Sequence, residues 1–386
     1  MRKAVSLAAL MGALLLVYAS GVLAQPETPT QNIPDRYIVV LEDNVQRPAA
    51  VANEQARENG LQLKFVYTST IEGYAAVFPN DRARQRVESD PRVDYVEQDQ
   101  VVRATAQTLP WGINKIDADI SSTAAITEDG GDLTNVNAYI IDSGIYNHSD
   151  LNVVGHVNFA GGKNTDCNGH GTHVAGTVAA RDNDQAVVGV APGAPLTGVK
   201  VLGCSGSGST SGVIKGVDWV TGNAKKPAVA NMSLGGGRSD TLDEAVRRSA
   251  ASGVFYALAA GNDGANACNS SPARAGAGTN NGIATVAATN KQDGETSWSN
   301  YGPCVDIWAP GYSILSTRKG GGTTTMSGTS MASPHVAGGA ALYLVNNASA
   351  GPSAVEGALT DTNTAQSTGT TSKDGRVITR ENVGGF

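Results

Sequence analysis

Apolar and polar residues follow two different patterns along the chain, and the first covers residues 25–103. Four short apolar runs occur there, "RYIVVLED", "LKFVYTS", "GYAAVF" and "VDYVEQD", and two charged runs typical of helices lie at residues 49–59 and 81–89. Their order along the chain is β-α-β-β-α-β. This pattern predicts a small α+β domain with ferredoxin-like topology.

The second pattern begins near residue 136, where short apolar strands alternate with helices rich in small residues. The expected strands are "NAYIID", "LTGVKVL", "VANMSL", "GVFYALAAG", "IATVAAT" and "VDIWAPG". Repeated βαβ units predict an α/β fold, a mostly parallel sheet flanked by helices on both faces. Such sheets bind ligands at the carboxyl ends of their strands, so reactive side chains are expected directly after these runs.

Composition supports a domain boundary near residue 104. Residues 25–103 hold 22 charged side chains and two glycines, whereas residues 104–386 hold 39 charged side chains and 43 glycines. The stretch "DQVVRATAQT" between them is polar and typical of an exposed link that a protease can cut. We therefore expect two domains, residues 25–103 and 104–386.

The first 24 residues have the pattern of a secretory signal peptide. Arg2 and Lys3 precede an apolar run that reaches Ala19, and small residues follow up to Ala24. The run is too short for a membrane span, and no later segment approaches the roughly 20 apolar residues that a span requires. We expect an exported, soluble protein.

Charge and cysteine content narrow the possible partners and the compartment. The net charge of −7 is mild and spread out, without a basic stripe for nucleic acid or a basic amphipathic helix for membranes, so we expect neither partner and a monomer. Four cysteines in an exported chain favour two disulfides over free thiols, and three pairings are possible. The cysteines are Cys167, Cys204, Cys268 and Cys304.

The stretch "NGHGTHVAG" places His170 and His173 three residues apart. A zinc-protease helix of the HExxH type separates its histidines by four and supplies a glutamate, and neither condition holds here. A catalytic base is the alternative, and it requires a nucleophile and a carboxylate brought in from distant strands. We expect His173 to be structural.

Three other side chains stand where such partners are expected. Asp142 ends the strand "NAYIID", Asn262 follows the strand in "YALAAGND", and Ser330 begins the small-residue helix of "SGTSMASPHVAG". Taken alone, each has a more ordinary interpretation, because Asp and Asn are common in turns and Ser is a common helix cap. Together with His170 they favour a nucleophilic Ser/His/Asp site with an amide that faces the oxyanion.

The four blocks "IIDSGI", "NGHGTHVAG", "AAGND" and "SGTSMASPHVAG" resemble the active-site blocks of the subtilisin-like serine proteases, and their Asp, His, Ser order is that of subtilisin. "PWGINKID", "ANMSLGGG" and "SNYGPCVDIWAPG" extend the similarity to the proteinase K and aqualysin branch over residues 104 to about 345. The segment from Arg36 to about Arg103 resembles the inhibitory propeptide of that family. From about Ala350 onward the likeness is loose.

The resemblance implies a secreted endopeptidase that works through an acyl-enzyme intermediate, in which His170 deprotonates Ser330, Asp142 orients His170 and Asn262 stabilises the oxyanion. Its substrate would bind as an added strand between two edges. The implied edge and pocket residues are Gly206, Ser207 and Gly208, then Ser233, Leu234 and Gly235, and the wall Ala259, Ala260 and Gly261. This small, uncharged wall predicts a broad preference for apolar or aromatic residues before the cut.

The resemblance also implies a disulfide pairing, Cys167 with Cys204 and Cys268 with Cys304. No cofactor is expected for catalysis. Asp306 matches the calcium carboxylate of the family, although the longer loop "RAGAGTNNG" disturbs the carbonyls that would complete the shell. The propeptide is expected to inhibit the enzyme within the same chain until cleavage near Arg103.

Two rival classes fit less well. An esterase of the α/β-hydrolase type uses GxSxG and the order Ser, Asp, His, whereas residues 328–332 read Gly-Thr-Ser-Met-Ala and the order here is the reverse. A binding module on an inactive scaffold would lack a catalytic group, and all four are present.

Overall fold

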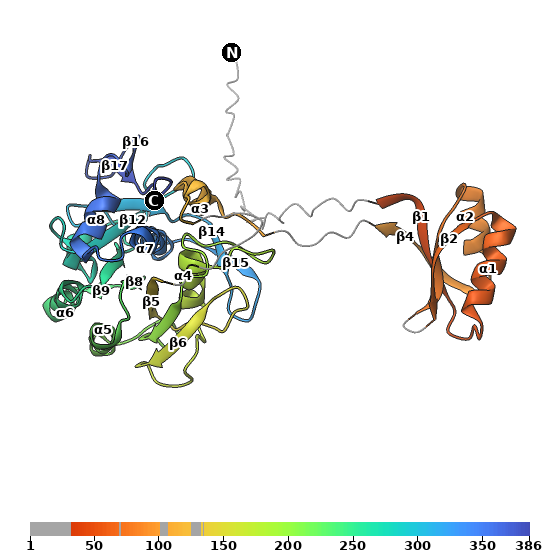
Figure 1. The fold of residues 1–386 in the computed structure, drawn as a ribbon, viewed down its shortest axis with the longest axis horizontal. Helices are drawn as coiled ribbons and strands as arrows, with labels where there is room; N and C mark the ends of the chain where they lie inside the picture. The colour runs from red at the N-terminus through yellow and green to blue at the C-terminus, as the bar shows by residue number, and fades with distance from the viewer. Residues whose placement is uncertain (1–31, 69–70, 101–106, 125–132, 134) are drawn as a thin grey trace, which may run out of the picture. The chain divides into compact units, whose positions relative to one another are not determined.

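The computed structural model describes residues 32–68, 71–100, 107–124, 133 and 135–386. The chain divides into two compact units, Met1–Arg103 and Ala104–Phe386, at the point where its composition changes (Figure 1). The expected signal peptide, and residues 101–106 around the expected cleavage point, lie outside the described residues.

The smaller unit has the β-α-β-β-α-β order that its apolar pattern predicts. Its elements are β1 (Asn32–Leu41), α1 (Pro48–Asn59), β2 (Gln62–Thr68), β3 (Glu72–Val77), α2 (Asp81–Glu88) and β4 (Val93–Gln100). The strands form an antiparallel sheet in the order β2-β3-β1-β4. The third strand of the chain thus pairs with the first, as ferredoxin-like topology requires.

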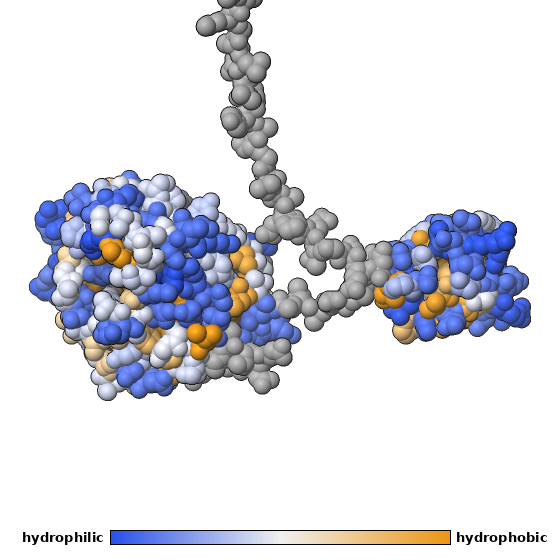
Figure 2. Space-filling model, turned by 90° about the horizontal axis from the view of Figure 1, so that it is seen from above, coloured by the Kyte–Doolittle hydropathy of each residue, from blue (hydrophilic) through white to orange (hydrophobic). Residues whose placement is uncertain are grey.

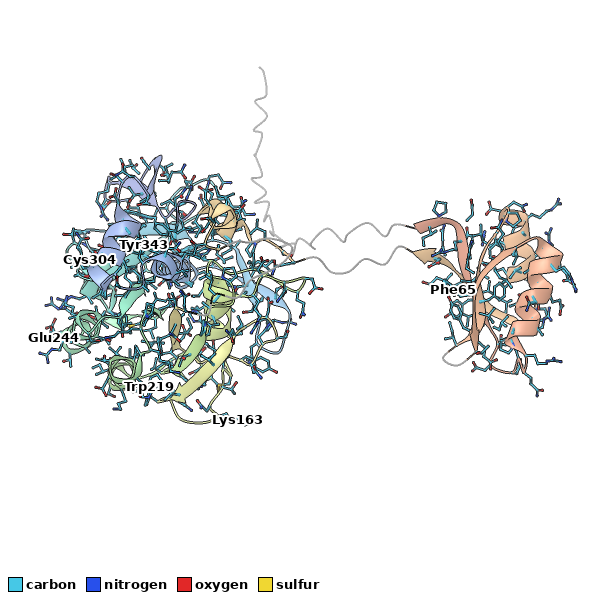
Figure 3. All side chains as sticks on the ribbon, in the orientation of Figure 1. Phe65, Lys163, Trp219, Glu244, Cys304 and Tyr343 are labelled. Carbon is cyan, nitrogen blue, oxygen red and sulfur yellow. A yellow bond between two sulfur atoms is a disulfide. The ribbon has the colours of Figure 1, made fainter. Side chains whose placement is uncertain are left out.

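The two helices of the smaller unit cover one face of this sheet. Val39 and Tyr74 are fully buried beneath them. The opposite face carries exposed aromatic side chains, because the strand register places Phe65 and Tyr95 on it, and Phe65 points away from the helices (Figure 3). Apolar patches are visible among the hydrophilic surface of this unit in Figure 2.

The larger unit is built on a nine-stranded sheet in the order β16-β17-β13-β12-β10-β8-β5-β7-β6. All neighbouring strands are parallel except β16 and β17. The strands are β5 (Asn137–Asp142), β6 (Val153–Asn158), β7 (Leu196–Lys200), β8 (Ala228–Met232), β10 (Phe255–Ala259), β12 (Ile283–Thr289), β13 (Ile307–Pro310), β16 (Gln366–Thr371) and β17 (Val377–Arg380). The prediction of a mostly parallel sheet is confirmed.

Helices cover both faces of this sheet (Figure 1). One face packs against α4 (His170–Ala179), α7 (Thr329–Asn346) and α8 (Pro352–Thr360), and the other against α5 (Thr210–Asn223) and α6 (Asp240–Ala251). The remaining elements are short: α3 (Trp111–Lys115), a hairpin of β14 (Ile314–Thr317) and β15 (Thr323–Met326), and a pair of β9 (Gly236–Gly237) and β11 (Ser270–Ser271). Within the described residues, no helix is long and apolar enough to cross a membrane.

The six strands that the apolar runs predict all occur, at the centre of the sheet. The strands at its edges, β6, β16 and β17, were not predicted. The run "QSTGTT" of β16 is polar and half exposed, so it lacks the apolar signal of a central strand. β17 pairs with β13 through Trp308 and Arg380 and with β16 on its other side.

Candidate active site

The end of β5 and the start of α4 bring Asp142 and His170 together. Nδ1 of His170 lies 2.8 Å from Oδ1 and 3.0 Å from Oδ2 of Asp142, whose side chain is fully buried. Gly171 permits this approach, because a Cβ at that position would lie 2.2 Å from the carbonyl oxygen of Gly144. The backbone N–H of Ser143 also donates to Asp142, at 2.6 Å.

Burial and the nearby carboxylates shift the pKa of His170 in opposite directions. Burial is the largest effect and disfavours the charged imidazolium, but the carboxylates of Asp142 and Asp166 together outweigh it, so the pKa is raised above the ordinary value of 6.5. The imidazole is therefore a stronger base than an exposed histidine. This suits a group that must accept a proton from a hydroxyl.

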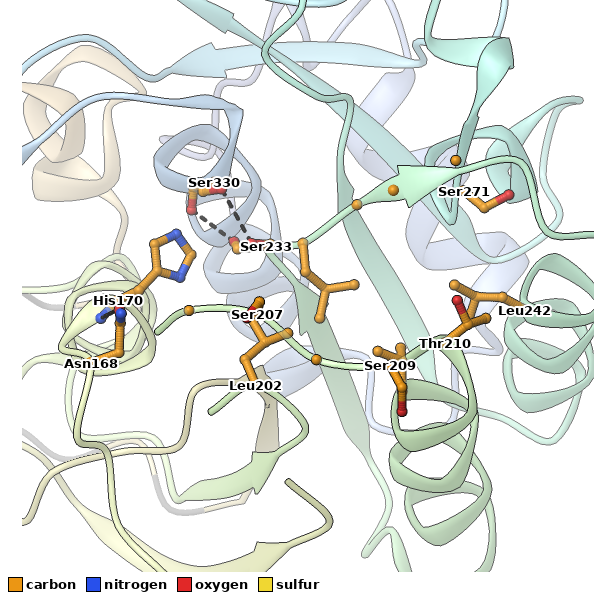
Figure 4. A pocket seen from close by; sticks show the side chains of 17 residues that line it. Asn168, His170, Leu202, Ser207, Ser209, Thr210, Ser233, Leu242, Ser271 and Ser330 are labelled. Carbon is orange, nitrogen blue, oxygen red and sulfur yellow. Dashed lines mark hydrogen bonds between the residues drawn. The ribbon is translucent and has the colours of Figure 1, made fainter. Parts of the chain in front are cut away.

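Ser330 lies in the first turn of α7 and lines the same cleft as His170 (Figure 4). Its hydroxyl donates to the carbonyl oxygen of Ser233 at 3.2 Å. Among the described residues no hydrogen bond joins Ser330 to His170. Catalytic hydrogen bonds often tighten only once substrate is bound, so this geometry is compatible with a nucleophile and its base.

Asn262, after β10, is held by Thr329. Its Oδ1 accepts hydrogen bonds from the backbone N–H of Thr329 at 2.8 Å and from the Thr329 hydroxyl at 3.1 Å. Both hydrogen bonds use the amide oxygen, so the amide nitrogen Nδ2 remains available as a hydrogen-bond donor. An amide N–H₂ next to the nucleophile can stabilise an oxyanion. Thr329 was not identified from the sequence.

The cleft beside His170 and Ser330 has a volume of about 430 Å³ and is lined by both expected edges. The residues of these edges are Gly206, Ser207 and Gly208 on one side and Ser233, Leu234 and Gly235 on the other. Sequence reasoning missed other lining residues, among them Asn168, Leu202, Val213, Leu242 and Ser271. Leu202 ends the apolar run of β7, which is the only signal that could have indicated it.

A neighbouring cavity contains the expected wall. Ala259, Ala260 and Gly261 line it together with Asn262 and residues 235–237. Asp263 and Asn269 also line it, so an acidic residue lies beside the small, uncharged wall. Asp263 is exposed, which lets water screen its charge and weakens its attraction for a basic side chain.

The two disulfides pair as the resemblance implied, and this prediction is confirmed. Cys167 bonds to Cys204 with a Cα–Cα distance of 4.9 Å, and Cys268 bonds to Cys304 with one of 5.3 Å. The first bridge ties the loop before His170 to the loop that carries the Gly206–Gly208 edge.

Asp306 lies close to a second buried carboxylate. Its Oδ2 accepts the backbone N–H of Thr285 at 2.7 Å, and its Oδ1 accepts no hydrogen bond from the described residues. Burial, and then the nearby Glu356, raise its pKa well above the ordinary value. An oxygen with spare capacity in a region of crowded negative charge fits one ligand of a calcium ion. The described residues contain no group of three or more His, Cys, Asp or Glu side chains that could hold a metal.

A serine, a histidine, a buried aspartate and an oriented amide at the carboxyl ends of parallel strands define a site for nucleophilic acyl transfer. The Subtilase family (Peptidase_S8) matches residues 135–377, and the Peptidase inhibitor I9 family matches residues 36–105. The chain therefore belongs to the subtilase family and carries an I9 segment before its catalytic domain. The rival esterase and binding-module classes are not supported.

Curated relatives extend the match over most of the chain. It is 44% identical over 361 residues to the alkaline serine exoprotease A of Vibrio alginolyticus, covering 84% of this chain and 63% of that protein. It is also 44% identical to an extracellular serine proteinase of a Thermus species, covering 85% of this chain and 84% of that protein.

Solved structures give the same fold. The crystal structure of a cold-adapted subtilisin-like serine proteinase is 42% identical, with a TM-score of 0.60, and the match covers 72% of this chain and 98% of that one. The larger unit thus has the subtilisin-like fold, preceded by a small propeptide with an antiparallel sheet and helices.

Proposed function

We propose that this chain is the precursor of a secreted, monomeric serine endopeptidase that hydrolyses peptide bonds through an acyl-enzyme intermediate. The observation that carries this proposal is the contact of His170 with the buried carboxylate of Asp142 in the cleft that Ser330 lines. The names of relatives, which include an extracellular proteinase, support secretion.

In this mechanism His170 removes the proton of Ser330 as its oxygen attacks the scissile carbonyl. The imidazolium that forms is stabilised by Asp142, and the developing oxyanion accepts a hydrogen bond from Nδ2 of Asn262. His170 then protonates the leaving amine. A water molecule, deprotonated by the same histidine, hydrolyses the acyl-enzyme and regenerates the hydroxyl of Ser330.

The test compares Ser330→Ala with Ser353→Ala, which changes an exposed serine on α8. In subtilisin, loss of the catalytic serine lowers turnover roughly 10⁶-fold, and this sets the expected size for Ser330→Ala. Ser330→Ala should also fail to react with a fluorophosphonate, whereas Ser353→Ala should keep both casein hydrolysis and labelling. Near-normal peptidase activity of Ser330→Ala would disprove the assignment.

The smaller unit is proposed to act as an intramolecular inhibitor that is removed by self-cleavage near Arg103. The I9 match to residues 36–105 supports this role. Mass spectrometry of the secreted Ser330→Ala protein should show an uncut precursor, whereas the native chain should yield a product that begins near Ala104. A cut Ser330→Ala protein from a host without other proteases would count against self-processing.

For specificity, we propose a broad preference for apolar or aromatic residues before the cut. The small wall of Ala259, Ala260 and Gly261 supports it, and the exposed position of Asp263 limits the competing attraction for lysine and arginine. Profiling on peptide libraries is the test. The proposed preference would be wrong if the native enzyme cleaved mainly after Lys or Arg and if Asp263→Asn lost this cleavage after basic residues.

Calcium binding at Asp306 is also proposed. Bound there, a calcium ion would supply positive charge to a region in which two carboxylates lie close together, and so would stabilise the loop before β12. Heat inactivation should be faster with a chelator, and the effect should be smaller in Asp306→Asn. Equal inactivation rates with and without chelator would count against a calcium ion.

A further inference from the structure

Asp166 lies four residues before His170, and no catalytic or binding role has been given to it above. Its side chain is 2% exposed and accepts five hydrogen bonds. Oδ1 accepts from the hydroxyl of Ser143 at 3.0 Å and from the backbone N–H groups of Asn168 at 2.9 Å and Gly169 at 2.8 Å. Oδ2 accepts from the N–H of Thr172 at 3.0 Å and from its hydroxyl at 2.5 Å.

These donors belong to the two segments that carry Asp142 and His170. Ser143 directly follows Asp142, and its hydroxyl oxygen also accepts the backbone N–H of Gly171 at 2.9 Å. Thr172 lies in the first turn of α4, and its hydroxyl oxygen accepts the N–H of Tyr146 at 2.9 Å. The carboxylate of Asp166 thus connects the end of β5 to the start of α4 through both of its oxygens.

The start of α4 needs such a connection because its own cap is weak. Gly169 is the N-cap residue, and it has no side chain that could accept the unpaired N–H groups of the first turn. Asp166 accepts two of the N–H groups near this end, those of Gly169 and Thr172, and its negative charge lies at the positive end of the helix dipole. A carboxylate that only accepts hydrogen bonds matches the ionised form.

Among the described residues, few charged side chains lie near Asp166 and His170, and one of them, the cation of Lys200, is held by hydrogen bonds. The Nζ of Lys200 is buried and donates to the carbonyl oxygens of Ser143 at 2.7 Å and Leu202 at 2.9 Å. Burial lowers the pKa of Lys200, while Asp166 and Asp142 act in the opposite direction. The other titratable or charged groups that face this region are His156, His170, His173 and Lys319.

We propose that Asp166 is a positioning residue for the hydrolytic reaction, which holds the strand end of Asp142 and the first turn of α4 in one geometry and stabilises the imidazolium of His170. The first part follows from the five hydrogen bonds. The second follows from the buried carboxylate of Asp166 in the loop that leads into α4, whose charge raises the pKa of His170. The proposal rests on the function proposed above, since it requires His170 to be the general base.

The main test is Asp166→Asn, made in the full chain so that processing is retained. Asparagine is similar in shape, but its Nδ2 cannot accept the two bonds from Thr172, and it carries no charge. We expect kcat per active site to fall at least about tenfold, because a charge-assisted hydrogen bond is lost. The acid limb of kcat/KM should move to lower pH by about half a unit or more, because the imidazolium of His170 is less stable when the negative charge of Asp166 is removed.

Active sites are counted by fluorophosphonate titration, so a loss of folded enzyme is not mistaken for a loss of turnover. The matched control is Asp218→Asn, which removes an exposed carboxylate on α5 and should leave both kcat and the acid limb unchanged. A merely structural role of Asp166 would lower the number of active sites without moving the acid limb. Either that result or native behaviour of Asp166→Asn overturns the proposal.

A second variant, Ser143→Ala, separates position from charge and decides the question if Asp166→Asn is not secreted. It removes the hydroxyl bridge between Asp166 and Gly171 but keeps every charge. We expect a lower kcat with an acid limb at the native pH, and an unchanged kcat overturns the positioning role. Ser330→Ala tests the proposed triad separately from the role of Asp166. Among these variants, it is the only one that should abolish fluorophosphonate labelling.

Discussion

The side chains around Ser330 are connected by hydrogen bonds through Thr329. The fully buried Thr329 donates its hydroxyl to Oδ1 of Asn262 and accepts the backbone N–H of Gly261, both at 3.1 Å. This hydroxyl, together with the backbone N–H of the same residue, orients the amide of Asn262, and it also holds one residue of the pocket wall. Its effect on catalysis is indirect, because it acts through Asn262.

Replacement of Thr329 tests this dependence. Thr329→Val removes the hydroxyl at nearly constant volume. Within the described part of the chain, it leaves the amide of Asn262 held only by the backbone N–H of Thr329, and it leaves the N–H of Gly261 without its acceptor. We expect kcat on a chromogenic peptide to fall about tenfold, toward the roughly 10²–10³-fold loss known for the oxyanion asparagine of subtilisin. Thr329→Ser keeps the hydroxyl and should retain most of the activity. Equal activity of the two variants would contradict the argument.

The pH dependence of activity follows from the charge on His170. The residue must be neutral to accept a proton, and the carboxylates of Asp142 and Asp166 raise its pKa above 6.5 despite burial. The acid limb of kcat/KM should therefore be centred above pH 6.5, with activity lost as the pH falls through it. Steady-state rates from pH 5 to 9 measure this limb. A limb centred below pH 6 would mean that burial lowers the pKa of His170 more than the two carboxylates raise it.

At the scale of elements, the packing of α4 against α7 buries two further histidines. Nε2 of His173 lies 3.0 Å from the carbonyl oxygen of Ile314, and Nδ1 of His335 lies 2.8 Å from that of Met331. Both side chains are fully buried, and burial lowers the pKa of each to about 4. The expected structural role of His173 agrees with this packing.

These two histidines should make the catalytic unit sensitive to acid. Each stays neutral when folded but takes up a proton below about pH 6.5 when unfolded, so stability is present above that pH and is lost as the pH falls toward 4. The shift corresponds to about 3 kcal/mol for each residue. Denaturant unfolding of the fluorophosphonate-inhibited enzyme at pH 7 and 4.5 measures the loss. His335→Gln should lose less stability between pH 7 and 4.5 than the native enzyme does. An equal loss would show that protonation of His335 does not cause the acid sensitivity.

At the scale of the whole molecule, the C-terminal tail is part of the catalytic unit. The N–H of Glu381 donates to Trp308 at 2.9 Å and that of Val383 donates to Ile116 at 2.8 Å, while the rings of Phe386 and Tyr343 meet at 5.4 Å. Ile378 and Val383 are fully buried. The tail thus joins β13, α7 and the segment after α3.

Deletion of residues 372–386 should therefore destabilise the enzyme. It exposes the edge of β13 and removes two buried aliphatic side chains, each worth about 2 kcal/mol in transfer free energy alone. We expect a clearly lower Tm and faster autolysis, measured by calorimetry of the inhibited enzyme. Val377→Thr, at a position that is 51% exposed, is the control and should have little effect. A native Tm after the deletion would show the tail to be dispensable.

The amino-acid sequence by itself determined the central strands and the division into two units, and it singled out Asp142, His170, Asn262 and Ser330 as candidate site residues. Continuous apolar runs mark buried parallel strands, so local pattern suffices for these strands. The four candidate residues follow strand ends or begin helices, where turn and cap residues are also common, so they stood out only in combination and through the resemblance of their sequence blocks. The edge strands β6, β16 and β17 could not be predicted in this way. β16 is polar like an ordinary loop, and β17 is only four residues long.

Only the tertiary structure decided which groups surround these residues. Asp166, Lys200 and Thr329 carry no local mark of function: the first resembles a turn residue, the second an ordinary strand position and the third a helix start. Their importance arises because folding removes them from water, and a buried polar group must find its partners among whichever segments packing brings near. Sequence pattern therefore indicates the candidate reactive side chains, whereas the groups that surround them depend on contacts between segments far apart in the chain.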